Sequence, residues 1–130
     1  MNMAMRTRFS ISLTLAAILL SSCSFSPQVI KSDDSGDLAY WYNMNHGAAE
    51  KAELQARNVI PAAQWPAVDQ NQVEIGMGPI AVEAAWGEPV TVNTTTTGAA
   101  QDVQWVYRTC ETCNASYVYF TNNVVTAIQN

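Results

Sequence analysis

Charged side chains are scarce in this sequence: Asp, Glu, Lys and Arg make up 13% of the 130 residues, whereas hydrophobic residues make up 48%. A long disordered chain has the opposite balance, so this composition excludes that class. From residue 23 onward four bases stand against eleven acids, a balance of 4 − 11 = −7. Nucleic-acid binding needs a basic surface, so we expect no nucleic-acid partner. The length favours a single domain.

Histidine, cysteine and catalytic motifs are also few. His46 is the single histidine, and the three cysteines are Cys23, Cys110 and Cys113. A structural zinc site takes roughly four ligands, and a second close pair of cysteines is missing, so no metal site is predicted. The sequence contains neither a phosphate-binding glycine loop nor a nucleophile-elbow motif. We therefore expect a protein that is not an enzyme and that has no cofactor apart from a covalent lipid.

The first 22 residues have the features of a secretion signal. Arg6 and Arg8 give a positively charged start, and residues 9–20 form an uninterrupted run of apolar and small hydroxyl residues. That run is shorter than the roughly 20 apolar residues that span a bilayer, which favours a signal peptide over a transmembrane helix. A buried helix is the alternative, but the charges, the apolar run and the cleavage-like end follow in the order typical of a signal.

The signal ends in Leu20-Ser21-Ser22-Cys23, which resembles the lipobox of bacterial lipoproteins. Small residues fit the pocket of a signal peptidase, and the thiol of Cys23 would accept a diacylglyceryl group. Acyl chains such as palmitate would then anchor the mature chain to a membrane. By resemblance to enterobacterial sorting rules, Ser24 favours the outer membrane, facing the periplasm, over the inner membrane.

After the signal, the chain divides into a tether and one domain. Residues 23–36 are rich in Ser, Pro, Asp and Gly and form the predicted lipidated tether. Residues 37–130 form the domain, whose first half has helical patterns. A helix is predicted over residues 37–57 with a break at His46, and a short helix over residues 80–86, which glycines and prolines bound on both sides.

The second half of the domain changes to a period of two, which is typical of β-strands. Residues 93–100, with four consecutive threonines, are predicted to form a loop or a hairpin tip. Asn122 and Asn123 are predicted to form a two-residue turn, since Asn tolerates a positive φ. The predicted fold is α+β, with two helical segments packed on one face of an antiparallel meander of three or four strands. The strands are predicted over residues 90–92, 103–108, 117–120 and 124–128.

The closely spaced Cys110 and Cys113 are the sharpest local motif of the domain. In an oxidising compartment such a pair is expected to form a local disulfide, here in the loop between two strands. A thioredoxin-type redox site is the alternative, but that motif opens a helix after a strand, and no such context surrounds this pair. We therefore predict a structural disulfide.

Aromatic residues are the candidates for contact with a partner. Tyr40, Trp41 and Tyr42 span about 200° of a helical wheel, so they cannot all face the core. We predict that Trp41 packs inward and that Tyr40 and Tyr42 contact a partner, because exposed tyrosines are favoured at interfaces. On the sheet, three further tyrosines are predicted to line a free face: Tyr107, Tyr117 and Tyr119. The opposite face is predicted to carry Val106, Val118 and Phe120.

Several motifs resemble the SmpA/OmlA (BamE-like) family of small outer-membrane lipoproteins. They are Ile75-Gly76-Met77 with the following helix and Gly87-Glu88-Pro89, the strand Gln104-Trp105-Val106-Tyr107, and the hairpin that runs from Tyr117 through Asn122-Asn123 to Ile128. The resemblance covers about residues 73–130 and implies helices packed on an antiparallel sheet, as in β-lactamase-inhibitor-type proteins. Gly78-Pro79 stands where the family usually has Ser or Thr, so the chain resembles a divergent relative.

Our first hypothesis for the function is a binding module: an outer-membrane-anchored periplasmic lipoprotein that contacts an envelope protein during envelope assembly or maintenance. The resemblance implies the β-barrel assembly machine as a partner to test, because the family includes one of its subunits. An inhibitor or ligand-binding lipoprotein that uses the sheet face is the alternative. A thiol redox protein acting through Cys110 and Cys113 is the third hypothesis.

Overall fold

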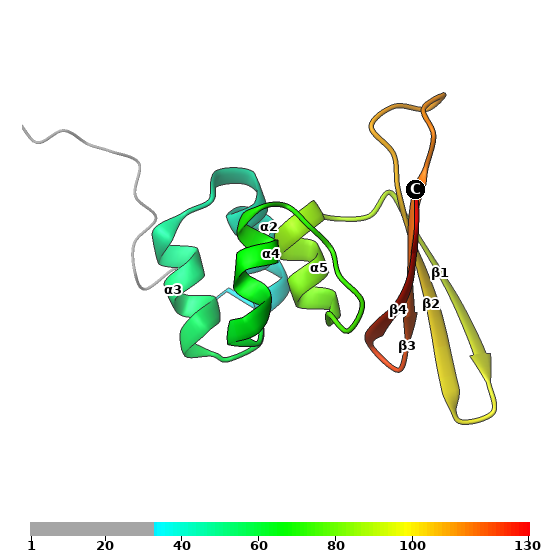
Figure 1. Ribbon diagram of the computed structural model, residues 1–130, viewed down its shortest axis with the longest axis horizontal. Helices are drawn as coiled ribbons and strands as arrows, with labels where there is room; N and C mark the ends of the chain where they lie inside the picture. Colours follow the sequence, from blue (N-terminus) through cyan, green and yellow to red (C-terminus); the bar gives the residue numbers. More distant parts are fainter. Residues whose placement is uncertain (1–32) are drawn as a thin grey trace, which may run out of the picture.

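The computed structural model describes residues 33–130 (Figure 1). The predicted signal at residues 1–22, the lipid site at Cys23 and most of the predicted tether lie outside the described residues. Within the described range, no helix has both the length and the apolarity needed to cross a membrane. The described chain has the predicted α+β arrangement, with helices in its first half and a four-stranded antiparallel sheet in its second.

The first two helices lie where one interrupted helix is predicted. They are α2, Ser35–Asn45, and α3, Ala48–Ala56. α2 begins earlier than predicted because the Asp34 carboxylate caps it, accepting a hydrogen bond from the backbone N–H of Asp37 at 2.9 Å. His46 adopts a left-handed conformation with φ 48° and ends α2, which confirms the predicted break.

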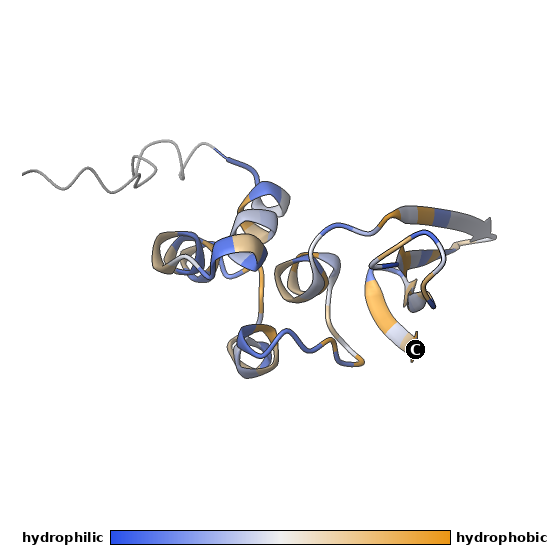
Figure 2. Cartoon of the chain, turned by 90° about the horizontal axis from the view of Figure 1, so that it is seen from above, coloured by the Kyte–Doolittle hydropathy of each residue, from blue (hydrophilic) through white to orange (hydrophobic). Residues whose placement is uncertain are grey.

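Three more helical segments complete the first half: the 3₁₀ helix η1, Ala62–Gln64, then α4, Trp65–Asp69, and α5, Pro79–Trp86. α5 confirms the prediction of a short helix, since Pro79 occupies its first turn and Gly87, with φ 78°, ends it. α5 lies between the other helices and the sheet (Figure 1, Figure 2). The side-chain amide of Asn43 in α2 donates to the carbonyl of Ala85 at 2.9 Å, which joins α2 to the end of α5.

The sheet is a meander in the order β1-β2-β3-β4. Its strands are Thr91–Thr97, Ala100–Tyr107, Ser116–Thr121 and Val124–Gln129. The prediction of a loop or hairpin tip over residues 93–100 is confirmed only for Gly98 and Ala99, which form the turn of a hairpin. The threonines up to Thr97 belong to β1. Gly98 has φ 61°, which suits the first position of a two-residue hairpin turn, and threonine favours strands over loops.

Strand register divides the sheet into a helix face and an outer face, because residues directly opposite one another point to the same side. The helix face carries the apolar side chains that contact the helices: Val103, Trp105, Tyr107, Val118, Phe120, Val125 and Ile128. Two predictions about the faces are wrong, because Tyr107 pairs with Ser116 while Tyr117 pairs with Val106. Tyr107 lies on the helix face and not with Tyr117 and Tyr119. Val106 lies on the outer face and not with Val118 and Phe120. The loop between β2 and β3 sets this register, and strand periodicity within one strand cannot reveal it.

β4 is the last strand at one edge of the sheet, and the segment before α5 contacts this edge. The carbonyl of Val125 accepts a hydrogen bond from the backbone N–H of Gly76, and its N–H donates to the carbonyl of Met77, both at 2.8 Å. The predicted turn before β4 is confirmed by φ values of 50° at Asn122 and 64° at Asn123. Gly76 and Met77 therefore satisfy the outward backbone groups of Val125 at the β4 edge, and they connect this edge to the start of α5.

Candidate functional site

The outer face of the sheet is not covered by the helices (Figure 2). Its side chains form three rows that run across all four strands. The middle row consists of Asn93, Gln104, Tyr119 and Ala127. The flanking rows are Thr91, Val106, Tyr117 and Gln129 on one side and Thr95, Asp102, Thr121 and Val124 on the other. Amide, hydroxyl and tyrosine groups thus dominate this face, and Asp102 is its single charged member.

A continuous chain of hydrogen bonds crosses the outer face. The Asn93 Nδ2 group donates to Gln104 Oε1 at 2.9 Å, and Gln104 Nε2 donates to the Tyr119 hydroxyl at 3.1 Å. The Tyr119 hydroxyl in turn donates to Gln129 Oε1 at 3.2 Å. Each residue donates to the next one, so all three hydrogen bonds point from β1 toward β4 and can polarise one another. The two bonds at the Tyr119 hydroxyl hold its ring in one orientation.

Two tyrosine rings stand beside this chain of hydrogen bonds. The rings of Tyr117 and Tyr119 lie with centroids 6.4 Å apart and an interplanar angle of 27°. Both side chains are half-buried, so part of each ring remains open to solvent. The carboxylate of Asp102 accepts a hydrogen bond from the Thr121 hydroxyl at 2.8 Å, and a hollow of about 450 Å³ lies beside these two residues. The outer face therefore offers fixed hydrogen-bonding groups next to aromatic surface.

Tyr42 does not lie on a contact surface, and this part of the prediction is wrong. Only 3% of the side chain is exposed, while Trp41, predicted to pack inward, is 38% exposed. Leu38, Ala39 and Tyr42 form the buried side of α2, so the turn of the helix places Tyr42 inward. Tyr40 is half-buried, with its ring 5.3 Å from that of Trp41. Of the two predicted contact residues on this helix, Tyr40 alone reaches the surface.

Buried Tyr42 joins three helices through Asp69. Its hydroxyl donates to the Asp69 carboxylate at 2.5 Å, and Lys51 Nζ lies 2.7 Å from the same carboxylate. Lys51 also lies 5.1 Å from the centre of the Trp65 ring, which is a cation–π distance. Burial raises the pKa of Tyr42, and the Asp69 bond raises it further, while hydrogen bonds from Lys51 and Tyr42 lower the pKa of Asp69. This cluster is structural: it fastens α2, α3 and α4 together.

Tyr107 lies on the helix face of the sheet. Its hydroxyl donates to the carbonyl of Gly87 at 3.0 Å, and its ring meets that of Trp86 edge-on at 5.3 Å. Burial raises the pKa of Tyr107, and the nearby charge of Glu83 adds to the effect. The ring also lines a groove of about 530 Å³ that runs from the end of α5 to Arg108. Tyr107 therefore fixes the end of α5 to the sheet and forms no part of the outer face.

The amide residues of the outer face are not among the predicted contact residues: they are Asn93, Gln104 and Gln129. Their alternation with apolar or inward-facing residues would have identified Gln104 and Gln129, because each lies on a predicted strand or just beyond it. Asn93 belongs to the segment predicted as a loop or hairpin tip, so its place opposite Gln104 does not follow from the sequence. The site becomes visible only when the threonine run is recognised as an edge strand.

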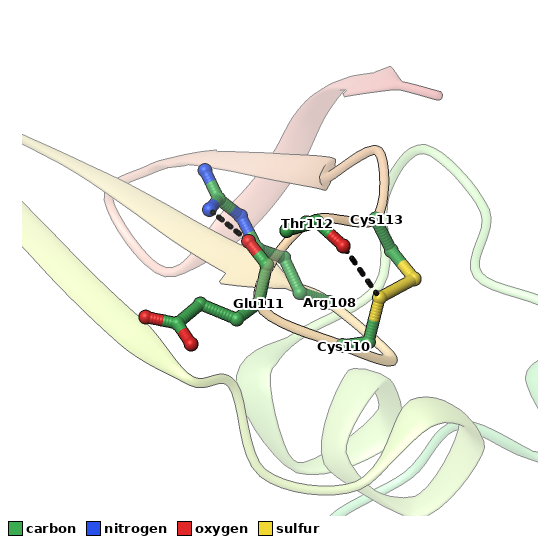
Figure 3. The surroundings of a disulfide bond; sticks show 5 residues. All are labelled: Arg108, Cys110, Glu111, Thr112 and Cys113. Carbon is green, nitrogen blue, oxygen red and sulfur yellow. Dashed lines mark hydrogen bonds between the residues drawn. A yellow bond between two sulfur atoms is a disulfide. The ribbon is translucent and has the colours of Figure 1, made fainter.

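Cys110 and Cys113 form a disulfide in the loop between β2 and β3 (Figure 3). The backbone N–H of Cys113 donates to the carbonyl of Cys110 at 3.2 Å, so the bridge closes a single tight turn. Arg108 Nη1 lies 3.5 Å from the carbonyl of Glu111, on the other side of the same loop. The pair follows a strand but opens no helix, unlike a thioredoxin-type motif, and this geometry favours a structural role.

Replacing both Cys110 and Cys113 with Ser should lower the free energy of unfolding by about 2 kcal/mol, because a bridge over so short a loop restricts the unfolded chain only modestly. The measurement is denaturant unfolding of the oxidised protein and of the double variant, followed by circular dichroism. Rapid reduction of the bridge by a mild dithiol, with no change in stability, would contradict this prediction and favour redox activity.

Glu83 is the most perturbed carboxyl group among the described residues. It lies half-buried on α5, and its Oε2 atom would lie 3.5 Å from a Cβ added at Gly36, at the start of α2. Burial raises the pKa of Glu83 to about 7, and the charges of Glu88, Asp34 and Asp37 contribute in the same direction. Acidic groups thus meet where α2 packs on α5.

The raised pKa of Glu83 predicts that stability falls between about pH 4.5 and pH 7. Below this window the carboxyl is protonated in the folded and the unfolded chain; within it, the unfolded chain loses its proton more readily, which favours unfolding. Glu83→Gln should therefore raise the free energy of unfolding at pH 8 by about 1 kcal/mol, a value reduced for solvent screening, and leave it nearly unchanged at pH 4. Chemical unfolding at the two pH values checks this, and equal effects at both would contradict it.

Among residues 33–130, no group of three or more His, Cys, Asp or Glu side chains is placed to hold a metal ion. Comparison with family models, with curated proteins and with solved structures found no match to this chain. The choice between candidate surfaces therefore depends on the geometry described above. Of these surfaces, the outer face is the one that combines exposure, fixed polar groups and aromatic rings.

Proposed function

We propose that this chain is a lipid-anchored periplasmic protein that binds an envelope protein through the outer face of its sheet, as a non-catalytic module in envelope assembly or maintenance. The observation that carries the proposal is the chain of hydrogen bonds from Asn93 through Gln104 and Tyr119 to Gln129, called the hydrogen-bonded row below. The anchor and the compartment are supported by the sequence at Leu20-Ser21-Ser22-Cys23. The β-barrel assembly machine is the first partner to test, on the resemblance to the SmpA/OmlA family.

A protein partner suits the chemistry of this face. Tyrosine and amide side chains contribute contact area and hydrogen bonds at protein interfaces, and a charged centre is generally avoided there. The row is already ordered by its internal hydrogen bonds, so little side-chain freedom is lost when a partner binds. The rows of side chains extend over four strands, and this width favours a protein surface over a small molecule, which generally binds in an enclosed pocket.

The proposal is tested by co-purification of the tagged, lipidated chain from detergent-solubilised envelopes. We expect Tyr117→Ala combined with Tyr119→Ala to lower the recovery of the partner about tenfold or more, because interface tyrosines commonly contribute 1–2 kcal/mol or more each. Tyr40→Ala tests the remaining predicted contact on α2: recovery should be unchanged if the outer face is the contact surface, and a loss with this variant instead would move the contact to α2. Tyr119→Phe keeps the ring but breaks the hydrogen-bonded row, so it separates the two contributions.

The identity of the recovered protein distinguishes the remaining hypotheses. Recovery of the barrel-assembly subunits in fixed proportion would support a role in that machine. Recovery of a soluble secreted enzyme would favour the alternative, an inhibitor that uses the same face. Equal recovery with the double tyrosine variant would contradict the outer face as the contact surface.

The anchor is tested separately at Cys23. Metabolic labelling with a palmitate analogue should mark the unaltered chain, and Cys23→Ser should abolish the label and release the protein from the membrane fraction. Density separation of the two membranes then distinguishes the proposed outer-membrane location from the inner membrane. Labelling that persists in Cys23→Ser would contradict lipidation at this residue.

A further inference from the structure

The two edges of the sheet differ in how they are protected. The β4 edge is contacted by Gly76 and Met77, which bond to the backbone of Val125, and the β3–β4 register shifts between Tyr119 and Phe120. β1 is the last strand of the sheet in the described part of the chain, and all seven of its residues are exposed. Its pairing with β2 runs from Thr91 to Thr97 without a register shift. β1 therefore presents a straight, open edge.

The sequence of β1 contains none of the features that usually prevent pairing at an edge. Thr-Val-Asn-Thr-Thr-Thr-Thr has no lysine, no acidic residue, no proline and no bulge. Charged residues and prolines are the common means by which proteins keep their outer strands from pairing with another chain. Threonine also has a high preference for strands. An open edge of this composition is suited to adding a strand.

We propose that β1 pairs with β1 of a second copy of this chain, antiparallel and about a two-fold axis at Thr94, to form one sheet that continues across both copies. Gly98 and Ala99 form a two-residue turn, so the flanking pair of Thr97 and Ala100 is hydrogen bonded. Along an antiparallel hairpin, hydrogen-bonded pairs alternate with pairs that are not hydrogen bonded to each other. The backbone groups of Val92, Thr94 and Thr96 consequently point away from β2. These are the groups that would bond to the second copy.

Self-complementarity selects a second copy as the occupant. With the axis at Thr94, Thr94 meets its own equivalent, Asn93 meets Thr95 of the other copy and Val92 meets Thr96. Threonine pairs across strands are favourable, and every cross-strand pair at the seam is uncharged. This matters in an acidic chain, because like charges that face each other across a seam oppose self-contact.

The nearest charge does not face the seam. Asp102 lies on β2, opposite Thr95, but its carboxylate bonds to the Thr121 hydroxyl on β3, on the side away from β1. One edge of seven residues makes a small interface, so we expect a weak dimer that membrane anchoring would concentrate. The pairing leaves the outer face free, so this inference can fail without affecting the proposed partner site.

Thiol cross-linking of the full chain in membranes tests the pairing. Thr94→Cys places two thiols opposite each other at the axis, in a hydrogen-bonded pair whose Cα atoms lie about 5.5 Å apart, and a short bifunctional thiol reagent should produce a covalent dimer in high yield. Met44→Cys is the control: it is exposed but lies on α2, away from β1 and from the outer face, and it should give no more dimer than the unaltered chain, which also corrects for Cys23. Absence of the Thr94→Cys dimer, equal yields from both variants, or an adduct of Thr94→Cys with another protein in place of the dimer would each overturn the proposal.

A second measurement uses sedimentation of the full chain in detergent. Thr94→Lys brings two like charges together at the axis and should raise the dissociation constant of the dimer at least about tenfold. Thr94→Val keeps the backbone groups and should leave the constant within about threefold. Circular dichroism verifies that both variants are folded. Equal dissociation constants for the lysine variant and the unaltered chain would overturn the proposal.

Discussion

Phe120→Ala should lower the free energy of unfolding by about 3–5 kcal/mol, the range for removing a large aromatic side chain from a core. Phe120 is 2% exposed, and its ring lies 4.8 Å from that of Trp105 on the helix face of the sheet. A domain of this size has a total stability of about 5–15 kcal/mol, so the variant would lose a large part of it. Denaturant unfolding followed by circular dichroism measures the effect.

Tyr119→Ala is the matched control for this prediction. Tyr119 is the preceding residue on β3 but points to the outer face, so its removal leaves no cavity in the core. We expect a loss of about 1 kcal/mol or less, from its cross-strand contacts and hydrogen bonds. Similar losses for Phe120→Ala and Tyr119→Ala would contradict the assignment of the two faces, because a register slip of one residue exchanges them.

Trp65→Ala should have an effect of similar size, about 3–5 kcal/mol. Trp65 is 6% exposed, its ring meets that of Tyr42 edge-on at 5.6 Å, and Lys51 lies over it. Removing the indole takes away packing between α2, α3 and α4 at the same time. The expected result is a large fall in the denaturant midpoint with a loss of helical signal.

Trp41→Ala provides the comparison for Trp65→Ala with the same change of side chain. Trp41 is 38% exposed and contacts the ring of Tyr40, so its removal should cost about 1–2 kcal/mol, less than the removal of the buried Trp65. The sequence prediction that Trp41 packs inward is not borne out, since Trp41 is an exposed residue in the structure. A loss from Trp41→Ala equal to or greater than that from Trp65→Ala would therefore contradict the structure and favour an inward-facing Trp41.

Local signals in the sequence were sufficient for much of the fold. Pro79 and Gly87 determine the ends of α5 by their own backbone preferences, and Asn122 and Asn123 determine the last turn in the same way. The threonine run belongs to a segment predicted as a loop or hairpin tip, because four consecutive polar residues followed by Gly98 are typical of either. In the structure, pairing with β2 along its full length makes it a strand, and that is a tertiary effect.

The candidate site was predicted only in part. Tyr117 and Tyr119 were placed together correctly because they alternate on one strand. Tyr42 and Tyr107 were misplaced because their orientation depends on the helix contacts of α2 and on the register of β2 with β3, neither of which has a local signal. The hydrogen-bonded row could not be predicted at all, since it joins residues from four strands that only the tertiary fold brings together.

The position of α5 has a consequence for distance from a membrane. α2 and α3 lie on the side of α5 away from the sheet, and the described chain begins at α2 (Figure 1). The eleven residues between Cys23 and Ser35 can extend by at most about 38 Å. In a chain anchored at Cys23, the helices would therefore lie between the bilayer and the sheet. The distance of α2 from the bilayer would be limited by the extension of these eleven residues, and this limit also restricts the height of the sheet. A partner that reaches the outer face must have its own contact surface at the same height.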